Sequence, residues 1–294
     1  MLLSASALAE GLLGDAVSTI PAEELQTLQL EIDNARLEHP NHFNAVHNLV
    51  GEAGALDQRK RGRMAPFSAM FKRLGAPAHM ALVELLLFKG PSQGELKDSA
   101  WFALRAGAIE AAGRSRDTRL TPALNAYLNG AETEFYAIRA AAEALGKIGT
   151  DEAAKALISA SEANPLKRGA IVAGMGYCRR AATADYLAGQ LENSTSEEMT
   201  DTLIKALRDV GNAYAWKTST VQRYASEEAS VRRTAAKALF EHYVTTPDGL
   251  LRDRSLKGLV VINHEDTRAW TQERLADENF ETRPALERLQ SRLR

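Results

Sequence analysis

The sequence contains very little cysteine and few aromatic residues. Cys178 is the only cysteine among 294 residues, so an internal disulfide is excluded and nothing indicates an oxidising compartment. Eight phenylalanines, seven tyrosines and three tryptophans leave the predicted core to aliphatic side chains and alanine. Helix faces lined by alanine let neighbouring helices approach closely, so we expect a tightly packed core.

Long apolar segments and catalytic motifs are also missing from the sequence. No stretch approaches the roughly 20 consecutive apolar residues of a membrane span, so we expect no membrane partner. The sequence has no glycine-rich phosphate loop, no serine-nucleophile elbow and no zinc-ligand spacing. We therefore predict a protein that is not an enzyme and uses no cofactor or metal. A catalytic site assembled from several repeats stays open at this point.

The first residues are small and apolar, and Ala7-Leu8-Ala9 resembles a signal-peptidase site. A secretory signal peptide would also need a basic start and a longer apolar stretch. The sequence therefore predicts a cytoplasmic protein, with a hidden export signal left open.

Residues 135–160 show the clearest pattern in the chain. Apolar residues from Phe135 to Leu145 recur at spacings of three and four, which places them on one face of a helix. Gly146 and Gly149 are expected to end this helix, because glycine tolerates the left-handed backbone of a helix exit. Thr150 can cap a second helix. A helix pair this small cannot bury its apolar face alone, so the pattern predicts stacked copies.

Weaker copies recur on both sides at intervals of about 32 residues. The positions in register with Leu145 are Leu74, Ala112, Met175, Leu207, Leu239 and Leu259. Residues three and four positions earlier are apolar in every copy except at Ser255. This repetition indicates an all-α fold, an α-solenoid of about six to seven helix pairs. The last interval is too short for a full unit, so we expect the array to become irregular after Tyr243.

The central unit carries a family resemblance in ten residues: Arg139, Ala141, Ala142, Ala144, Leu145, Gly146, Ile148, Gly149, Ala153 and Leu157. This pattern resembles the HEAT-like repeat first named in phycobilisome lyases. The match weakens elsewhere, since Arg208 and Phe240 stand where Gly146 does and Arg179 stands where Gly149 does. The resemblance covers about residues 60–276 and implies an α-α superhelix of antiparallel helix pairs. It implies little about activity, because such repeats serve scaffolds, adaptors, lyase subunits and a few DNA-repair enzymes.

The charge pattern suggests three parts of a single continuous solenoid. Residues 1–57 hold nine acids and one base, lack the repeat motif and are predicted to form an acidic N-terminal helical cap. Residues 58–276 form the predicted repeat array. Residues 277–294 are strongly charged, as expected of a C-terminal cap with a polar outer face.

A basic segment begins the array. Residues 58–83 contain six bases and no acid, namely Arg59, Lys60, Arg61, Arg63, Lys72 and Arg73. Arginine suits bidentate pairing with carboxylates, so we predict that these six residues contact an acidic protein partner. The alternative is internal, in which the acidic N-terminal cap folds back and screens the same charges.

Cys178 and three histidines are weaker candidates for chemistry. In the repeat register Cys178 occupies the column of Ile148 and Val210, so we predict a buried and inert thiol. His39, His42 and His47 lie close together in the sequence. Pro40 divides them and their spacing does not suit one helix face, so we predict surface or capping roles rather than metal binding.

The three tryptophans are predicted to fill the core. Trp216 falls where the register puts the inward-facing Ala154, and with Thr220 and Tyr224 it would form a row at four-residue spacing. An aromatic ligand platform on that row stays open. Trp101 and Trp270 have no partner motif and receive the same core assignment.

These observations favour a non-enzymatic scaffold or adaptor that binds a protein on the concave surface of a HEAT-type solenoid. A bilin lyase-like enzyme subunit is one alternative, and it rests on the resemblance alone. A HEAT-like DNA-binding or DNA-repair protein is another. The charge balance argues against nucleic acid, because such binders usually carry a basic stripe along one face and here only one short run is basic.

Overall fold

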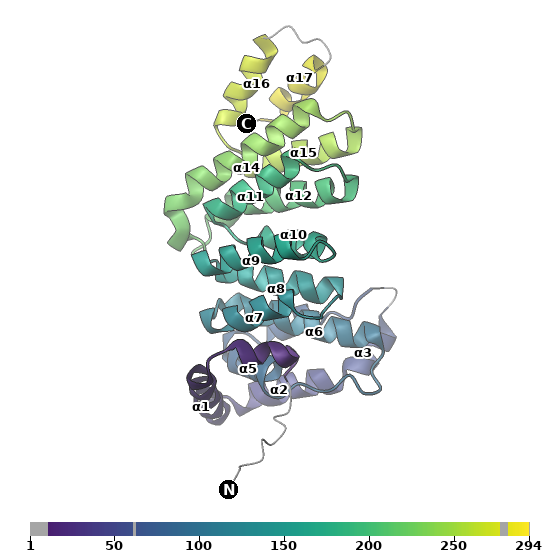
Figure 1. The fold of residues 1–294 in the computed structure, drawn as a ribbon, viewed down its shortest axis with the longest axis vertical. Helices are drawn as coiled ribbons and strands as arrows, with labels where there is room; N and C mark the ends of the chain where they lie inside the picture. The colour runs from purple at the N-terminus through teal and green to yellow at the C-terminus, as the bar shows by residue number, and fades with distance from the viewer. Residues whose placement is uncertain (1–10, 61–62, 277–281, 294) are drawn as a thin grey trace. The chain divides into compact units, whose positions relative to one another are not determined.

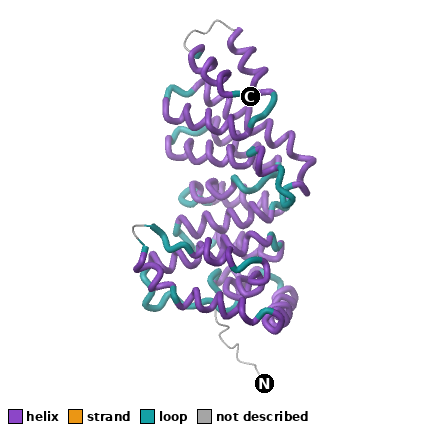
Figure 2. The backbone as a smooth tube through the Cα atoms, turned by 180° about the vertical axis from the view of Figure 1, so that it is seen from behind, coloured by secondary structure: helices purple, strands orange, loops and turns teal. Residues whose placement is uncertain are grey.

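A computed structural model describes residues 11–60, 63–276 and 282–293. All regular structure in these residues is helical, and no strand occurs among them (Figure 2). The predicted all-α fold of stacked helical repeats is thereby confirmed. The chain divides into two compact units, Met1–Ala153 and Ala154–Arg294. None of the described helices has both the length and the apolar composition that crossing a bilayer requires.

The first unit consists of α-helices and short 3₁₀ helices, the latter labelled η (Figure 1). They are η1 (Gly14–Thr19), α1 (Ala22–Glu38), α2 (Pro40–Gly51), α3 (Ala53–Arg59), α4 (Phe67–Arg73), η2 (Ala76–Ala78), α5 (His79–Leu87), α6 (Asp98–Ala112), η3 (Gly113–Ser115), η4 (Thr118–Leu120), α7 (Thr121–Asn129) and α8 (Phe135–Ile148). Helix α9 (Asp151–Ala163) begins in this unit, and the division between the units falls within it.

Helices α4, α6 and α8 lie side by side as the first helices of three successive repeats. This row agrees with the repeat register, which placed Leu74, Ala112 and Leu145 at equivalent positions near the helix ends. Glycine makes the close approach possible, since a Cβ built on Gly113 would lie 2.7 Å from the Cα of Ala144. The alanine-rich packing expected from the sequence is therefore present.

Helix α8 begins and ends much as its sequence predicts. The Glu134 carboxylate accepts hydrogen bonds from the backbone N–H groups of Tyr136 and Ala137, at 2.9 and 2.6 Å. Gly149 ends the helix with a left-handed φ of 66°. Gly146, expected to share that role, lies inside the helix. Thr150 caps the next helix, because its Oγ1 accepts from the Ala153 N–H at 3.1 Å.

The N-terminal helices pack against α5, as α1 and α2 both contact it. Helix α2 begins at Pro40, and His39 is its N-cap residue. Proline suits the first helical position, where the missing N–H would have no intrahelical partner. Just before η1, the N–H groups of Leu12 and Leu13 donate to the carbonyls of Leu85 and Leu86, both at 3.0 Å. These bonds satisfy carbonyls that the end of α5 leaves without intrahelical partners.

The second unit is also built of helices. They are the rest of α9, α10 (Arg168–Met175), α11 (Ala181–Glu192), α12 (Glu197–Val210), α13 (Ala213–Trp216), η5 (Gln222–Tyr224), α14 (Ala225–Thr245), α15 (Gly249–Ile262), α16 (Asp266–Ala276) and α17 (Arg283–Arg292). Helix α12 lies between α10 and α15 in one row, while α14 contacts α11 and α16 in the other.

The repeat register fails at Leu239. It assigned Leu239 to the first helix of a repeat, whereas α14 lies in the row of second helices and α15, with Leu259, is the next first helix. The irregularity therefore starts after Val210 rather than after Tyr243. The cause is the segment between α12 and α14, where the short helix α13 delivers the fully buried Trp216 into the core.

Candidate functional site

A groove of about 840 Å³ runs over the second helices of the second unit. Its walls come from α11, α14 and the Trp270 side chain of α16. Two rows of α14 residues at four-residue spacing face it, Arg233, Lys237, Glu241 and Thr245 in one and Thr234, Ala238 and His242 in the other. Small side chains at Ala188 and Ala238, together with Gly189, keep the groove open. An opening of this size suits side chains from another chain.

Ion pairs connect the charged side chains of the groove to each other and to α16. Arg233 Nε lies 2.9 Å from a carboxylate oxygen of Asp266, and Lys237 Nζ lies 2.8 Å from Glu241. Arg274 also contacts Glu241, at 3.2 Å. These groups are partly exposed, so the pairs contribute little to stability and their charges remain accessible to a partner.

The groove wall that α16 contributes is aromatic. The ring of Trp270 stacks on His264 with an interplanar angle of 4° and lies 5.8 Å from the ring of Phe240. Lys237 Nζ lies 4.8 Å from the Trp270 ring centroid, a cation–π contact. Burial lowers the pKa of His264, and it also lowers the pKa of His242 in the groove wall. Both imidazoles are therefore predominantly neutral at pH 7.

The six basic residues predicted to bind an acidic partner have different surroundings. Lys60 Nζ lies 2.5 Å from Asp57, and Lys72 forms an ion pair with Glu110. Arg59, Arg63 and Arg73 are exposed and have no ion pair among the described residues. Arg61 lies outside the described residues. The structure thus commits the two lysines to acids of this chain, and it leaves the three described arginines accessible.

The acids that pair with these lysines are held ionised. Burial alone would raise the pKa of Asp57, but hydrogen bonds from Lys60 and from Ser99, at 2.7 Å, lower it below the ordinary value. The pKa of Glu110 is lowered in the same way, since the hydrogen bond from Lys72 outweighs burial. Asp57 belongs to the acidic N-terminal segment, so one contact of the internal alternative is present.

Cys178 is fully buried and shares its column with the buried residues Ile148, Val210 and Ile262. Burial raises the pKa of its thiol to about 11, and the hydroxyl of Thr183 donates a hydrogen bond to its sulfur at 3.2 Å. A thiol with this pKa is almost entirely protonated at pH 7 and is a poor nucleophile. The prediction of a buried cysteine is confirmed.

The histidines 39, 42 and 47 lie around the junction of α1 and α2. The rings of His39 and His42 meet edge to face with centroids 5.8 Å apart. His47 is exposed on α2 and lines a smaller opening between α2 and α5. In the described part of the chain, no three histidine, cysteine or acidic side chains gather in a way that could hold a metal ion.

The tryptophan predictions are confirmed for Trp216 alone. Its ring is fully buried, and its Nε1 donates to the Val210 carbonyl at 2.9 Å. The predicted row with Thr220 and Tyr224 is wrong, because α13 ends at Trp216. Trp101 and Trp270 are half-buried rather than core residues.

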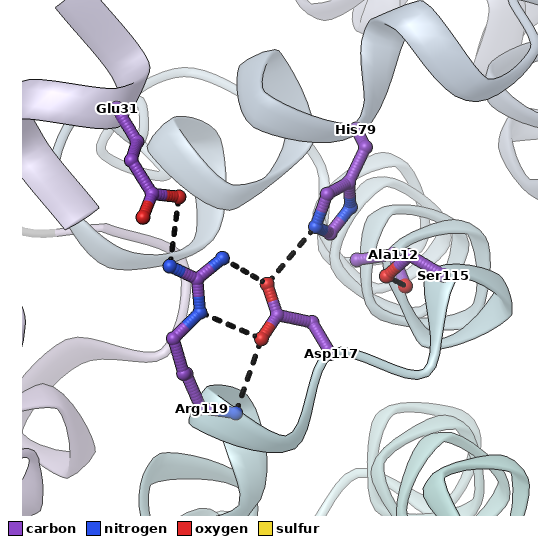
Figure 3. Close-up of polar contacts among 6 residues, drawn as sticks. All are labelled: Glu31, His79, Ala112, Ser115, Asp117 and Arg119. Atoms are coloured by element: carbon purple, nitrogen blue, oxygen red, sulfur yellow. Dashed lines mark hydrogen bonds and ion pairs between the residues drawn. The ribbon is translucent and has the colours of Figure 1, made fainter.

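An ion-pair network in the first unit joins four residues from three segments, namely α1, the start of α5 and η4 with its N-cap residue (Figure 3). Asp117 accepts two hydrogen bonds from the Arg119 guanidinium, at 2.9 and 2.8 Å, and lies 3.1 Å from a ring nitrogen of His79. Arg119 reaches on to Glu31 of α1 at 2.8 Å. Burial alone would raise the pKa of Asp117, but the hydrogen bonds from His79 and Arg119 hold it well below its ordinary value. The network fastens α1 to the repeats.

A second opening in the first unit, of about 790 Å³, surrounds Arg105 and Trp101. Arg105 forms an ion pair with Glu132, and the Tyr127 hydroxyl donates to the same carboxylate at 2.9 Å. Both oxygens of Glu132 are occupied, because the other accepts from the N–H groups of Thr133 and Glu134. The Glu132 carboxylate is therefore satisfied within the chain.

Sequence reasoning missed both the groove and the network. Each is built from residues that are ordinary helix-surface types in the sequence. The available signal for the groove was the small-residue set Ala188, Gly189 and Ala238 on the second helices, which the register did not align.

A comparison with known protein families finds a match over part of the chain. Residues 95–176 match the family model of HEAT repeats, the stretch that includes the strongest copy of the sequence pattern. No curated protein matches the chain.

Proposed function

We propose that the protein is a non-enzymatic scaffold or adaptor that binds another protein, because residues 95–176 match the family model of HEAT repeats. HEAT repeats generally mediate protein–protein interaction. The observation that carries the proposal is the open groove over α11, α14 and α16. Its walls offer small and aromatic side chains with exposed charges, which is the composition of a protein-binding surface. We also propose that the protein acts in the cytoplasm.

The chemistry of the side chains supports a binding role over catalysis. The only thiol is buried and has a raised pKa, and the two histidines beside the groove have lowered pKa values because of burial. His242 is bonded to Ser255 at 2.9 Å, but Ser255 is fully buried and out of reach of a substrate. The His242–Ser255 pair therefore offers a substrate no accessible nucleophile.

A capture experiment tests the proposal. The tagged protein is incubated with native extract and bound proteins are identified by mass spectrometry, beside two groove variants, Ala188→Trp and Lys237→Glu. Lys257→Glu, on an exposed part of α15, is the matched control. We expect a partner that the wild type and the control retain and that both groove variants lose. Retention by both groove variants would place the binding surface elsewhere, and the absence of any saturable partner would contradict the scaffold role.

The three accessible arginines extend the proposal to a second surface for an acidic partner. Replacing Arg59, Arg63 and Arg73 by serine should weaken association and reduce its salt dependence, because surface charges attract through a screened field. Stability should change little, as these arginines have no ion pair among the described residues. Serine replacements of Arg139, Lys257 and Arg268 are the control. A fall in melting temperature with unchanged binding would instead support the internal role of this segment.

We propose no role for nucleic acid. Phosphate binding grows with the number of basic contacts, and outside residues 58–83 the repeats carry both signs of charge. We expect no submicromolar binding of duplex DNA in an anisotropy titration at about 150 mM salt. Binding at that level would overturn this part of the proposal.

A further inference from the structure

Helix α1 lies at the edge of the first unit and leaves one of its sides uncovered by the described residues (Figure 1). Its inner side carries Leu28 and Ile32, which are fully buried. The opposite side carries four exposed residues at spacings of three, four and three, namely Thr27, Leu30, Asn34 and Leu37. Residues at these spacings share one helix face, and we call these four the α1 seam.

Two leucines form the apolar part of the α1 seam. Leu30 is 66% exposed and Leu37 is 82% exposed, and a separation of seven residues places them about 10 Å apart along the helix. Single exposed leucines are ordinary on a protein surface. Leucines repeated every seven residues, with seam residues midway between them, are instead the pattern of a helix that packs along another helix. The seam therefore fits a second helix lying against α1.

Acidic side chains border the α1 seam on both flanks. Glu24 and Glu38 lie on one flank and Asp33 lies on the other, at the positions where paired helices place their interhelical charges. None of these three acids has an ion pair among the described residues. Asp33 accepts only a hydrogen bond from Gln29, at 3.1 Å. The flanks of the seam thus offer carboxylates that the described part of the chain does not neutralise.

The surrounding charges leave this negative sign unchanged. Four charged side chains pair with α1 or with its ion-pair partners, namely Glu84, Lys89, Asp117 and Arg119. Two are acidic and two are basic, so they cancel. Helix α1 itself has five acids and one base, which leaves a net charge of −4 on the helix and these neighbours with the histidines neutral.

The same ion pairs hold α1 in place while its seam stays open. Glu31 of α1 binds Arg119 at 2.8 Å, and Arg36 of α1 binds Glu84. Both pairs join α1 to elements packed on its inner side. A binding helix would therefore meet a surface that is already ordered, which reduces the entropy lost on association.

Charge decides which kind of helix covers the α1 seam. A second copy of α1 would place acids opposite acids, which disfavours self-pairing. On the basis of the proposed scaffold role, we infer that the α1 seam binds a helix of a partner protein whose apolar stripe is flanked by lysine or arginine. The apolar stripe covers Leu30 and Leu37, and the basic side chains pair with the flanking acids. This surface is distinct from the groove over α11, α14 and α16.

Three fluorescein-labelled helical peptides of equal length test this inference. The first has leucine at the seam positions of its heptads and lysine on both flanks, the second has leucine with glutamate flanks, and the third has serine with lysine flanks. Like charges on both flanks keep each peptide from pairing with itself. Anisotropy titrations with the intact protein at low salt should show the leucine–lysine peptide binding about tenfold more tightly than either other peptide.

Two pairs of substitutions on α1 separate the apolar contact from the charge. Leu30→Ser with Leu37→Ser should weaken binding of the leucine–lysine peptide by about tenfold, because the apolar contact is lost. Asp33→Lys with Glu38→Lys should move the preference toward the leucine–glutamate peptide. All four positions are exposed, so the fold should be kept, and circular dichroism checks this for each variant.

Matched substitutions in the second unit serve as controls. Leu166→Ser with Leu250→Ser replaces two exposed leucines, and Glu162→Lys with Glu192→Lys reverses two exposed acids. Both control variants should bind the three peptides as the wild type does. Losses in the controls equal to those in the α1 variants would show that the peptides bind non-specifically, and the inference would be wrong.

Three further results would overturn the inference. They are equal affinities of the wild type for the two leucine peptides, no binding of any peptide up to a millimolar concentration, and self-association in sedimentation equilibrium that the α1 substitutions abolish, which would assign the seam to a second copy. A natural partner that the groove variants lose and the α1 variants retain would, together with any of these results, reject the seam while keeping the scaffold role. The two proposals can thus fail separately.

Discussion

Replacing Asp117 by asparagine tests how the ion-pair network holds α1 against the repeats. The Asp117 side chain is only 9% exposed and accepts from Arg119, from the Arg119 backbone N–H at 3.1 Å and from His79. Asparagine keeps one acceptor oxygen but removes the charge that Arg119 faces. Breaking a fully buried ion pair costs about 3–5 kcal/mol. Arg119 is partly exposed and retains Glu31, so we expect a loss of about 2 kcal/mol in the free energy of unfolding.

The pH dependence of this loss separates the charge from the shape of the side chain. The pKa of Asp117 in the folded protein lies below its unfolded value, which is about 3.9. The carboxylate therefore stabilises the fold fully above about pH 5, and this contribution is lost as the pH falls through the folded pKa. The difference between wild type and Asp117→Asn should be constant from pH 7 to pH 5 and should shrink at lower pH.

Urea unfolding followed by circular dichroism measures this difference, and hydrogen exchange of the α1 amides locates it. Asp33→Asn, at an exposed position of the same helix α1, is the control and should change stability by less than about 0.5 kcal/mol. A loss below that value for Asp117→Asn, or a difference that stays constant down to pH 3, would refute the account of the network.

Three further predictions concern packing and reactivity. Cys178 should react with a thiol reagent at pH 8 only after unfolding, because its thiol is buried and burial raises its pKa to about 11. Rapid stoichiometric labelling of the native protein would contradict this burial. Cys178→Ala should lower the free energy of unfolding by about 1–2 kcal/mol. Gly113→Ala should destabilise the fold by about 1–3 kcal/mol, since the new Cβ would lie 2.7 Å from the Cα of Ala144. Gly51→Ala is the control, because a Cβ at that position meets nothing within 4 Å. Equal effects of the two substitutions in thermal melts would argue against the close helix contact. Trp216→Phe should lower the free energy of unfolding in urea by about 1–3 kcal/mol, because it opens a small cavity and leaves the Val210 carbonyl without its Nε1 donor. No change in stability would show that the Trp216 ring does not fill the core.

The local sequence determined the elements of the repeat. Apolar spacing of three and four identified the central helix pair, Gly149 ended α8 and Thr150 capped α9, because these features depend on residues within one or two turns of each other. The column position of Cys178 also predicted its burial. A repeat that contacts mainly its neighbours can be recognised in this way from one chain.

Only the tertiary structure decided which helices lie side by side and which charges remain free. The register put Leu239 in the wrong row because it rests only on a spacing of 32 residues. At that spacing the register expects a regular second helix after α12, and the chain instead has the short helix α13 with Trp216. Lys72 belongs to the segment that was predicted to contact an acidic partner, and the structure pairs it with Glu110 on the adjacent helix α6. The groove depends on the contact between α11 and α14, which α12, α13 and η5 separate in the sequence. Periodicity sets the face that a helix buries, whereas its neighbour on that face is selected by packing between distant segments.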